Sequence, residues 1–590
     1  MAKTKSGVTP TTQSGVDPKS IPCKLGNVPI EFDKIQGNIF GGFSKDHHVT
    51  ILLEITDAAK ARAALRPMTT KEGVLKDVDD SIYNHVVHSD SRAVIAFNEQ
   101  FRALRRDGIP ECTIIATWTN LVFTARGMQQ LDLELNAFPE AFKGGDSGNG
   151  FLGMFGRASE IGDQGDNAPA YWDKDMDVRV NKWENIGAAI LVSSDDASQL
   201  NVDDPQSRVG RYLATLNSKN SGLTILGIIR GETRTDDVGH EHFGFKDGVS
   251  QPGIRGVDAP DDALHNPDQG NPGQDLLHPG EFVLGYPRQI PAQEDAGPGG
   301  PNRCQGIKAG ESFYTTDPEG SKTVLPPWAL NGSFLVFRRL AQDVKGFRDS
   351  IDANATLLGI TSDLLGAKLV GRYKSGAPLE ALRNQAGIGE YHPPLTDPGK
   401  AHPALANSNS INNYFEYGDD ADGKIVPLAS HIRKAYPRDQ EAEQEFGTPN
   451  PKADGAESRT QTHRLLRRGI PFGRSLNAPQ GGKPEDARGL LFFAYQSDIE
   501  RQFEFVQRHW VNDPDFPEKG AGQDPIIANS KPEGEIKGCP FHEKANAAKC
   551  PVSFKHFVKT RGGQYFFSPS IPTLGDWLTT VTFGTSRPLV

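Results

Sequence analysis

Short aliphatic and β-branched runs alternate with segments of helical character along most of the chain. The run at 49–55 predicts a strand, and the Ala-rich segment 58–65 that follows it predicts a helix. The same pairing recurs in the second half, where 333–338 predicts a strand and 343–351 predicts the helix after it. The other expected strands are 112–118, 121–124, 188–192, 223–229 and 489–494, and the other expected helices are 99–104, 204–216 and 498–510.

Two halves with similar strand and helix alternation predict an α+β fold that arose by duplication, with antiparallel sheets. The expected boundaries are a disordered tail over 1–26, an N-terminal lobe over 27–255 and a C-terminal lobe over 256–590. No repeat is strong enough in sequence to prove the duplication. Four segments rich in Pro, Gly, Asn and Asp predict long loops or insertions: 258–303, 385–422, 442–457 and 512–548.

The composition agrees with a large, loop-rich globular protein. At 590 residues the chain exceeds the roughly 250–300 residues at which a single core stops growing. Its 63 glycines and 42 prolines predict many ordered loops. The formal net charge of −11 argues against binding to a phosphate backbone, because nucleic-acid-binding proteins generally carry a basic face. We therefore expect no nucleic-acid partner.

The chain has no run that approaches the roughly 20 apolar residues of a membrane-spanning helix, so no membrane partner is expected. Residues 1–21 are rich in Thr, Ser, Gly and Pro and lack the apolar core of a secretory signal. These features favour a cytoplasmic protein, although a secreted mature form that had lost its signal would look the same. Five cysteines are too few and too scattered for a disulfide scaffold.

A single carboxylate lies between two glycines in the segment 244–248, Gly-Phe-Lys-Asp-Gly. Glycine adopts positive φ readily and lets the backbone approach a ligand closely. A turn-forming polar run that ends at Pro252 follows. The side chain of Asp247 is therefore expected to face a cavity rather than bulk solvent.

A histidine and three cationic residues share the segment 431–438, His-Ile-Arg-Lys-Ala-Tyr-Pro-Arg. Pro437 prevents a long helix there. Two interpretations stay open. Most histidines are structural, so His431 could be a surface or capping residue. Alternatively it is a metal or haem ligand, and its cationic neighbours pair with carboxylates such as haem propionates.

An arginine pair follows two leucines in the segment 463–473 and precedes a Gly-x-Pro sequence that breaks secondary structure. The pair is either the solvated end of a strand, which is the common case for such residues, or the source of a fixed cation, Arg467, that reaches into a pocket. The residues alone leave both interpretations open.

The three segments together resemble the dye-decolourising peroxidases, and the long insertions are typical of a larger subgroup of that family. The family's G-x-x-D-G signature matches 244–248, its H-I-R-K-x-x-P-R run matches 431–438, and its L-R-x-x-x-P-[YF]-G segment places the distal arginine at Arg467. Order and context agree over nearly the whole chain. Further matching segments are 32–38, 280–286, 328–334 and 562–570.

The resemblance implies a peroxidase with one haem b per chain, held mainly by the C-terminal member of two ferredoxin-like lobes. His431 would be the axial ligand of the haem iron, and Arg433 would be one of the cationic neighbours that bind the cofactor. Asp247 would move a proton between the two peroxide oxygens, and Arg467 would polarise the O–O bond.

An axial histidine usually donates its second ring N–H to a carboxylate, and the resemblance directs the search for that partner to 495–500. Asp498 is favoured over Glu500, although either could instead be an acid at a helix N-terminus. On the preceding strand, Leu490 and Phe492 share one face by the period of two. They would line the distal pocket, and core packing explains the same pattern equally well.

The implied partners are hydrogen peroxide and aromatic or dye electron donors, and the implied state is a monomer or homodimer. Because bulky dyes do not reach a buried haem, the resemblance implies electron transfer through surface aromatic residues. Most aromatic side chains are simply part of a core. The tryptophans considered are Trp183, Trp328, Trp510 and Trp577.

Other functions remain open on the residues alone. A haem-binding or iron-retrieving protein without peroxidase turnover would need His431 but not Asp247 together with Arg467. A non-haem hydrolase built on Asp247 would explain neither of the other two residues. Separately, the cysteines and histidines within 539–556 could ligate zinc, but their spacing matches no common finger, so free thiols or a disulfide are alternatives.

Overall fold

The fold is centred on one large β-sheet. The predicted tail at 1–26 and the predicted loop at 442–457 lie outside the residues that the structure describes, as does most of the loop at 258–303. The computed structural model describes residues 30–69, 89–106, 114–133, 135–136, 138–172, 182–254, 256–258, 274, 276–286, 288, 313–315, 322–324, 326–382, 393–407, 411–413, 415, 417–438, 460–477, 483, 487–530 and 554–579.

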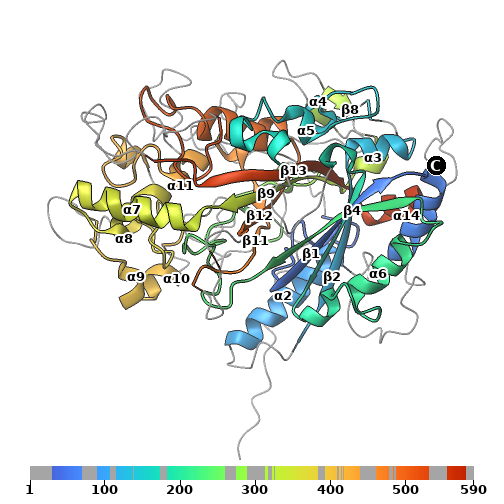
Figure 1. Ribbon diagram of the computed structural model, residues 1–590, viewed down its shortest axis with the longest axis horizontal. Coiled ribbons are helices and arrows are strands. Elements are labelled where there is room, and N and C mark those ends of the chain that lie inside the picture. The colour runs from blue at the N-terminus through green and yellow to red at the C-terminus, as the bar shows by residue number, and fades with distance from the viewer. Residues whose placement is uncertain are drawn as a thin grey trace, which may run out of the picture.

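The central sheet has nine strands in the order β10-β12-β9-β13-β2-β3-β1-β4, with β11 paired to β12. Strands that precede residue 233 form one half, and strands that follow residue 332 form the other (Figure 1). The halves meet where Phe567 of β13 pairs with Phe123 of β2. The strands are β1 His47–Ile55, β2 Thr117–Phe123, β3 Ala188–Ser194, β4 Leu223–Glu232, β9 Ser333–Gln342, β10 Leu466–Arg467, β11 Ile470–Phe472, β12 Gly489–Gln496 and β13 Val558–Ser568.

This sheet confirms the predicted α+β class and the antiparallel pairing, because all of its strand pairs are antiparallel. The halves join edge to edge, so the sheet is continuous. The division into two ferredoxin-like lobes at 27–255 and 256–590 stays a prediction. Shorter strands outside the central sheet are β5 Gly253–Ile254, β6 Leu276–Leu277, β7 Phe313–Thr315 and β8 Lys322–Val324.

Polar caps decide where two of the predicted helices begin. Asp57 accepts a backbone hydrogen bond at the start of α1, Ala58–Leu65. Ser207 does the same for α6, Arg208–Leu216, which is therefore shorter than the predicted 204–216. The other α-helices of the described residues are α2 Ser91–Arg106, α3 Ala125–Gln130, α4 Glu140–Lys143, α5 Met154–Arg157, α7 Val344–Leu358, α8 Ser362–Val370, α9 Pro398–Ala401, α10 Ala404–Asn407, α11 His431–Ala435 and α14 Ile571–Thr579.

One local prediction was wrong, and another was right about the helix but not about its type. The separate strands expected at 112–118 and 121–124 are one strand, β2, in which Asn120 is buried and accepts a hydrogen bond from the backbone N–H of Asn38 at 3.0 Å. The helix expected over 498–510 is present, but it consists of two π-helical stretches, Glu500–Glu504 and Val506–Val511. At Asn120 a tertiary contact outweighs the local pattern.

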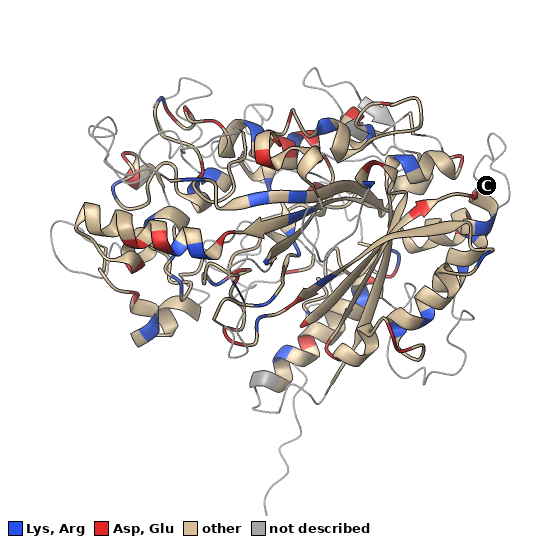
Figure 2. Cartoon of the chain, in the orientation of Figure 1, with Lys and Arg blue, Asp and Glu red and all other residues tan. Residues whose placement is uncertain are grey.

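Aromatic side chains fill the core where the two halves of the sheet join. Phe334 of β9 and Phe567 of β13 both pack against Phe138, and Trp577 of α14 packs against Phe123. In Figure 1, α7 and α8 lie at the left end of the view and α14 lies at the right. Figure 2 shows acidic and basic residues interspersed along the helices and loops. None of the described helices has the length and apolar character needed to cross a membrane.

Candidate active site

The loop that carries Asp247 is shaped by its two glycines. Gly244 has a φ of 97° and Gly248 a φ of 70°, in the region that side chains rarely adopt. The backbone N–H of Asp247 donates to the Gly239 carbonyl at 3.0 Å. Its Oδ1 accepts a hydrogen bond from the N–H of Gly248 at 2.7 Å, and the side chain is 37% exposed. The glycines therefore present the carboxylate away from the core, and its placement toward a cavity rather than solvent stays a prediction.

Arg467, at the end of β10, lies beside this carboxylate. Its Nη1 is 3.8 Å from Asp247 Oδ1, and its Nη2 donates to the Ser250 carbonyl at 2.7 Å. The backbone of Arg467 makes two further hydrogen bonds with the side-chain amide of Gln251, at 3.3 and 3.2 Å. A carboxylate and a guanidinium that are more than 200 residues apart in sequence are thus held together, and both remain partly exposed.

His431 begins α11 and keeps 28% of its side chain exposed, although Ser430 before it and Arg433 and Lys434 later in the helix are buried. Its Nδ1–H donates to Asp524 Oδ2 at 2.8 Å. Among the described residues, its Nε2 makes no hydrogen bond. One ring nitrogen is therefore fixed, and the other is available to a ligand.

The charges of Asp247 and Arg467 act on the ring of His431. Burial lowers the pKa of the His431 imidazole, but the Asp524 carboxylate raises it by more, so the pKa lies above its usual value. The charges of Arg467 and Asp247 also act on this ring, in opposite directions. The structure thus places the histidine within electrostatic reach of the Asp247–Arg467 pair.

The carboxylate on His431 is not the one expected from the sequence. Asp498 accepts a hydrogen bond from the backbone N–H of Arg501 at 2.9 Å, and Glu500 accepts one from Ala141 at 3.0 Å. The partner is instead Asp524, 93 residues beyond the histidine. It falls in the segment predicted only as a loop, where no motif singles it out.

Asp524 is buried, and both of its carboxylate oxygens are engaged. Its Oδ1 accepts backbone hydrogen bonds from Ile526 at 2.7 Å and Ile527 at 3.1 Å, and its own N–H donates to the Val511 carbonyl at 3.0 Å. Oδ2 is left for His431. The carboxylate is oriented by the protein, which is typical of the group behind a metal-ligating histidine.

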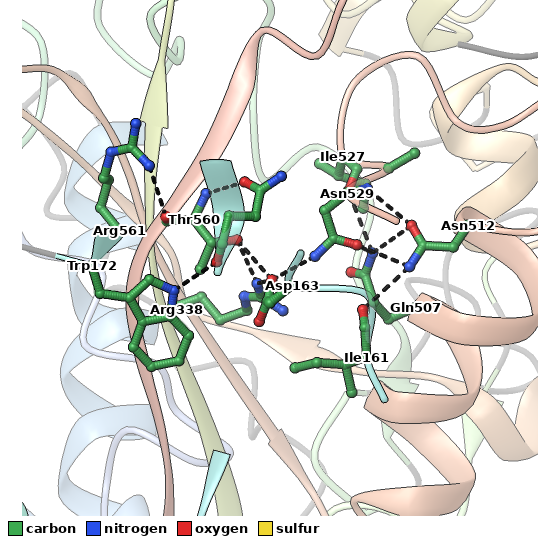
Figure 3. A network of polar contacts seen from close by, with 12 residues as sticks. Ile161, Asp163, Trp172, Arg338, Gln507, Asn512, Ile527, Asn529, Thr560 and Arg561 are labelled. Atoms are coloured by element: carbon green, nitrogen blue, oxygen red, sulfur yellow. Dashed lines mark hydrogen bonds and ion pairs between the residues drawn. The ribbon is translucent and has the colours of Figure 1, made fainter. Parts of the chain in front are cut away.

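A buried polar network ties the segment that carries this carboxylate to the central sheet (Figure 3). The Asn512 carbonyl accepts a hydrogen bond from Gln523 at 2.6 Å, and Asn512 Nδ2 donates to Asn529 Oδ1 at 2.9 Å. Asn529 Nδ2 in turn donates to Asp163 at 2.6 Å. Asp163 is fully buried and forms an ion pair with Arg338 of β9. The segment is therefore anchored to the sheet by charged and amide groups shielded from water.

Arg433 does not have the contacts predicted for a cofactor-binding cation. Its guanidinium donates to Asp420 Oδ2 at 3.2 Å and to the Val426 carbonyl at 2.6 Å. It also lies over the Tyr417 ring, 4.6 Å from the ring centroid. Asp420 balances the charge of this buried side chain, and a role for Arg433 in binding a cofactor carboxylate stays a prediction.

Two other buried arginines lack a carboxylate partner among the described residues. Arg438 has a buried Nη1 without any hydrogen-bond partner. Arg372 donates to the carbonyls of Gly376, at 3.1 Å, and Asn412. Burial and then the Arg438 guanidinium lower the pKa of Arg372 to about 9. Buried cations of this kind call for an anion, and the two propionates of a haem would fit. Arg438 ends the run that the sequence singled out, whereas no sequence signal marked Arg372.

Leu490 and Phe492 alternate along β12 with residues that are fully packed. Both are half-buried, while Leu491 and Phe493 between and beyond them are buried. The exposed face therefore has the period of two that the sequence predicted. Phe492 contacts the ring of Phe503, with a centroid separation of 6.3 Å. That this face lines a distal pocket stays a prediction.

A metal centre built only from protein ligands is not seen: within the described residues no three His, Cys, Asp or Glu side chains gather to hold a metal ion. Of the candidate zinc ligands, Cys539, His542 and Cys550 lie outside the described residues. His556 uses Nδ1–H to donate to the Ala528 carbonyl at 2.5 Å. A metal at His431 would thus have one protein ligand, which fits the iron of a haem.

None of the four tryptophans considered for electron transfer is fully exposed. Trp183, Trp510 and Trp577 are buried, and Trp328 is half-buried. Tyr171, by contrast, is 42% exposed and directly precedes Trp172, whose ring meets that of Trp183 edge-on at 5.9 Å. Among the described residues, Tyr171 is the aromatic side chain most open to solvent.

Comparisons with known proteins agree with this set of residues. A family profile described as Dyp-type peroxidase, C-terminal, matches residues 321–518, the part of the chain that holds His431 and Arg467. A dye-decolorizing peroxidase of Mycena epipterygia is 30% identical over 609 aligned positions, which cover 95% of this chain and 91% of that protein.

Solved structures show the same similarity. An ancestral D-type dye-decolorizing peroxidase is 28% identical, with a TM-score of 0.67 and coverage of 93% of this chain and 100% of that one. A dye-decolorizing peroxidase in complex with 2,6-dimethoxyphenol is 25% identical, with a TM-score of 0.62 and the same coverage. The similarity thus extends over nearly the whole chain, well beyond the matched C-terminal profile.

Proposed function

The chain belongs to the dye-decolourising peroxidase family, and from this premise we propose that it is a haem peroxidase that reduces hydrogen peroxide and oxidises dyes and phenols in one-electron steps. The observation that carries the proposal is the grouping of Asp247 and Arg467 with a histidine whose Nδ1 is held by a carboxylate and whose Nε2 has no hydrogen-bond partner among the described residues. The names of the relatives support dyes as donors, and the dimethoxyphenol complex of a similar protein supports phenols.

The described residues fit one haem b per chain. His431 would hold the iron through Nε2. Arg438 and Arg372 would bind the propionates, because both are buried cations without a carboxylate partner in the described part of the chain. Bound haem supplies the redox chemistry that peroxide reduction requires. Asp524 keeps the proton on His431 Nδ1 and strengthens the basicity of Nε2. All four residues follow residue 256, which supports a cofactor held mainly by the C-terminal part of the chain.

Asp247 moves the proton in this proposal. Its Oδ1 is engaged by the N–H of Gly248, whereas Oδ2 makes no hydrogen bond among the described residues. Oδ2 therefore takes a proton from one oxygen of hydrogen peroxide and passes it to the other oxygen, which leaves as water. The Arg467 guanidinium stabilises the negative charge that develops on the departing oxygen. Ser250 and Gln251 keep that cation in place.

Donors of different size would use different routes. A small phenol has the dimensions of a ligand that enters a pocket, whereas a bulky dye would deliver its electron at the surface. Tyr171 is the exposed aromatic side chain closest in sequence to the buried Trp172 and Trp183, so it is our candidate for that surface contact.

The proposal is tested by replacing Asp247 with Asn in the haem-loaded protein. The amide keeps the shape of the side chain but no longer takes up a proton, so we expect the rate of reaction with hydrogen peroxide to fall about 100- to 10,000-fold. The Soret band of the resting protein should be unchanged. Stopped-flow absorbance measures both.

Asp237→Asn is the matched control, because Asp237 lies on the same loop and is 42% exposed. It should react with peroxide as the wild type does. An unchanged rate in Asp247→Asn would sink the assignment of the proton shuttle. A Soret band without oxidation of either an anthraquinone dye or a phenol would favour the haem-binding or iron-retrieving alternative.

A further inference from the structure

An open groove of about 690 Å³ adjoins the loop that carries Asp247. Its walls include Gly244 and Lys246 of that loop, Arg348 of α7, and Lys374. The three residues of the candidate active site do not line it. The volume lies within the roughly 300–1,000 Å³ of sites that hold small molecules. The groove is therefore a second candidate binding site, separate from the residues assigned to peroxide chemistry.

Three half-buried cations of this groove have no carboxylate partner among the described residues. The ammonium of Lys246 bonds to the side-chain carbonyl of Asn407, and Nη1 of Arg348 donates to Asn477 Oδ1 at 2.8 Å. The ammonium of Lys374 makes no hydrogen bond or ion pair within the described part of the chain. Neutral amides solvate two of these charges, and no described acid balances any of them.

The acidic residue that lines the groove already pairs with other groups. Asp237 lies 3.0 Å from Nδ1 of His240 and 3.8 Å from Nη1 of Arg234. Lys400, a further cation of the lining, is paired at 3.3 Å with Asp363. The three cations without acid partners therefore leave the groove with an excess of positive charge, although the chain as a whole carries a net charge of −11.

The wall of the groove and the loop of Asp247 form one unit. The Lys374 carbonyl accepts hydrogen bonds from the N–H of Lys246 at 3.0 Å and from Nε2 of His240 at 3.1 Å. The stem of Lys374 also lies against Gly244, where an added Cβ would be 3.8 Å from Lys374 Cδ. An occupant of the groove would thus contact the same backbone that presents the proposed proton shuttle.

We propose that this groove binds a small organic anion, whose carboxylate or sulfonate oxygens are held by Lys246, Arg348 and Lys374. Ammonium and guanidinium groups form their strongest hydrogen bonds with such oxyanions. The groove is far larger than one inorganic ion, so the remaining volume accommodates a ring system. Binding requires neither haem nor peroxide, so the proposal stands or falls separately from the peroxidase assignment.

Calorimetry on the purified protein at low ionic strength tests the site with three probes: naphthalene-2-sulfonate, its uncharged analogue naphthalene-2-sulfonamide, and inorganic sulfate. We expect the sulfonate to bind with one-to-one stoichiometry and to bind at least about tenfold more tightly than either of the others, because a hydrogen bond to a charged group contributes more than one to a neutral group. Equal affinity for the sulfonamide, or for inorganic sulfate, would overturn the proposal.

Lys374→Gln and Lys246→Gln should each weaken sulfonate binding by about tenfold. Lys345→Gln is the matched control: Lys345 lies on α7 near Arg348, but it pairs with Asp349 and does not line the groove. Undiminished binding in both groove variants, or equal loss in the control, would contradict the assignment. If the variants fold poorly, the wild type still decides, since its affinity must fall as salt is added and a salt-independent affinity rules the site out.

Discussion

Asp247 and Arg467 are both 37% exposed and lie 3.8 Å apart, whereas Asp524 is fully buried and uses both carboxylate oxygens in hydrogen bonds. The two sides of the candidate site are thus built differently. A group that gives and takes a proton must be reached by its substrate, and a group that orients a metal ligand must not move. The exposed side suits the first task, and the buried side suits the second.

Because of this difference, changes on the buried side should mainly affect the stability of the fold, and changes on the exposed side should mainly affect the rate of reaction. On the histidine side, Asn529 links the segment of Asp524 to the buried pair of Asp163 and Arg338 (Figure 3), so changes there should lower the free energy of unfolding. On the exposed side, Asp247→Asn should slow the reaction with peroxide and leave the free energy of unfolding within about 0.5 kcal/mol of the wild type.

The largest effect on stability is expected for Asp163→Asn. This change leaves the buried guanidinium of Arg338 without its counter-charge, which costs about 3–5 kcal/mol. Urea unfolding measures the loss. Asp166→Asn is the control, because Asp166 is 58% exposed and pairs with Lys559 at the surface, where an ion pair contributes about 0–1 kcal/mol. If both variants lose similarly little free energy of unfolding, the buried ion pair of Asp163 contributes no more to stability than the surface pair of Asp166. The proposed difference between the buried and exposed sides of the site would then be wrong.

The next effect depends on pH and concerns the loop of Asp247. Burial lowers the pKa of His242 to about 4, and one ring nitrogen of His242 bonds to the Phe472 carbonyl of β11 at 2.8 Å. The neutral ring is favoured in the folded state. Its contribution to stability is therefore complete above the unfolded pKa of about 6.5 and is lost as the pH falls from there towards 4.

His242→Gln removes this titration. Between pH 7 and pH 4.5 the wild type should lose about 2–3 kcal/mol more than the variant, as measured by urea unfolding at the two pH values. His402→Gln, at an exposed histidine, should follow the wild type. If His242→Gln loses as much stability as the wild type between pH 7 and pH 4.5, protonation of groups other than His242 accounts for the loss.

Asp524→Asn is expected to lower stability less than Asp163→Asn or the protonation of His242. The amide still accepts the two backbone hydrogen bonds, but the charged bond to His431 is lost, at a cost of about 1–2 kcal/mol. The variant should also release haem more readily on gel filtration, followed by the Soret absorbance. Asp513 lies on the same segment but does not contact His431, so Asp513→Asn should retain haem as the wild type does. Equal haem retention in both variants would argue against Asp524 as the positioning group.

The sequence pattern correctly predicted elements whose bounds depend on residues that are close together in the chain. The helix 58–65 was predicted with its observed bounds because a polar cap and an Ala-rich run coincide there. Asn120 shows the limit: the separate strands predicted on either side of it are one strand, because the asparagine side chain is satisfied by Asn38, which is remote in sequence. Leu490 and Phe492 share a partly exposed face, as the period of two predicted.

The sequence by itself determined the carboxylate, the histidine and the arginine of the site, because flanking glycines, a proline-terminated run and a strand breaker mark these residues in their own segments. Only the tertiary structure decided their partners. Asp524 rather than Asp498 holds His431, Arg433 pairs with Asp420, and Arg438 and Arg372 remain without a described carboxylate. Partner choice depends on which charges share a buried, low-dielectric space, and the fold decides that by bringing together segments far apart in sequence.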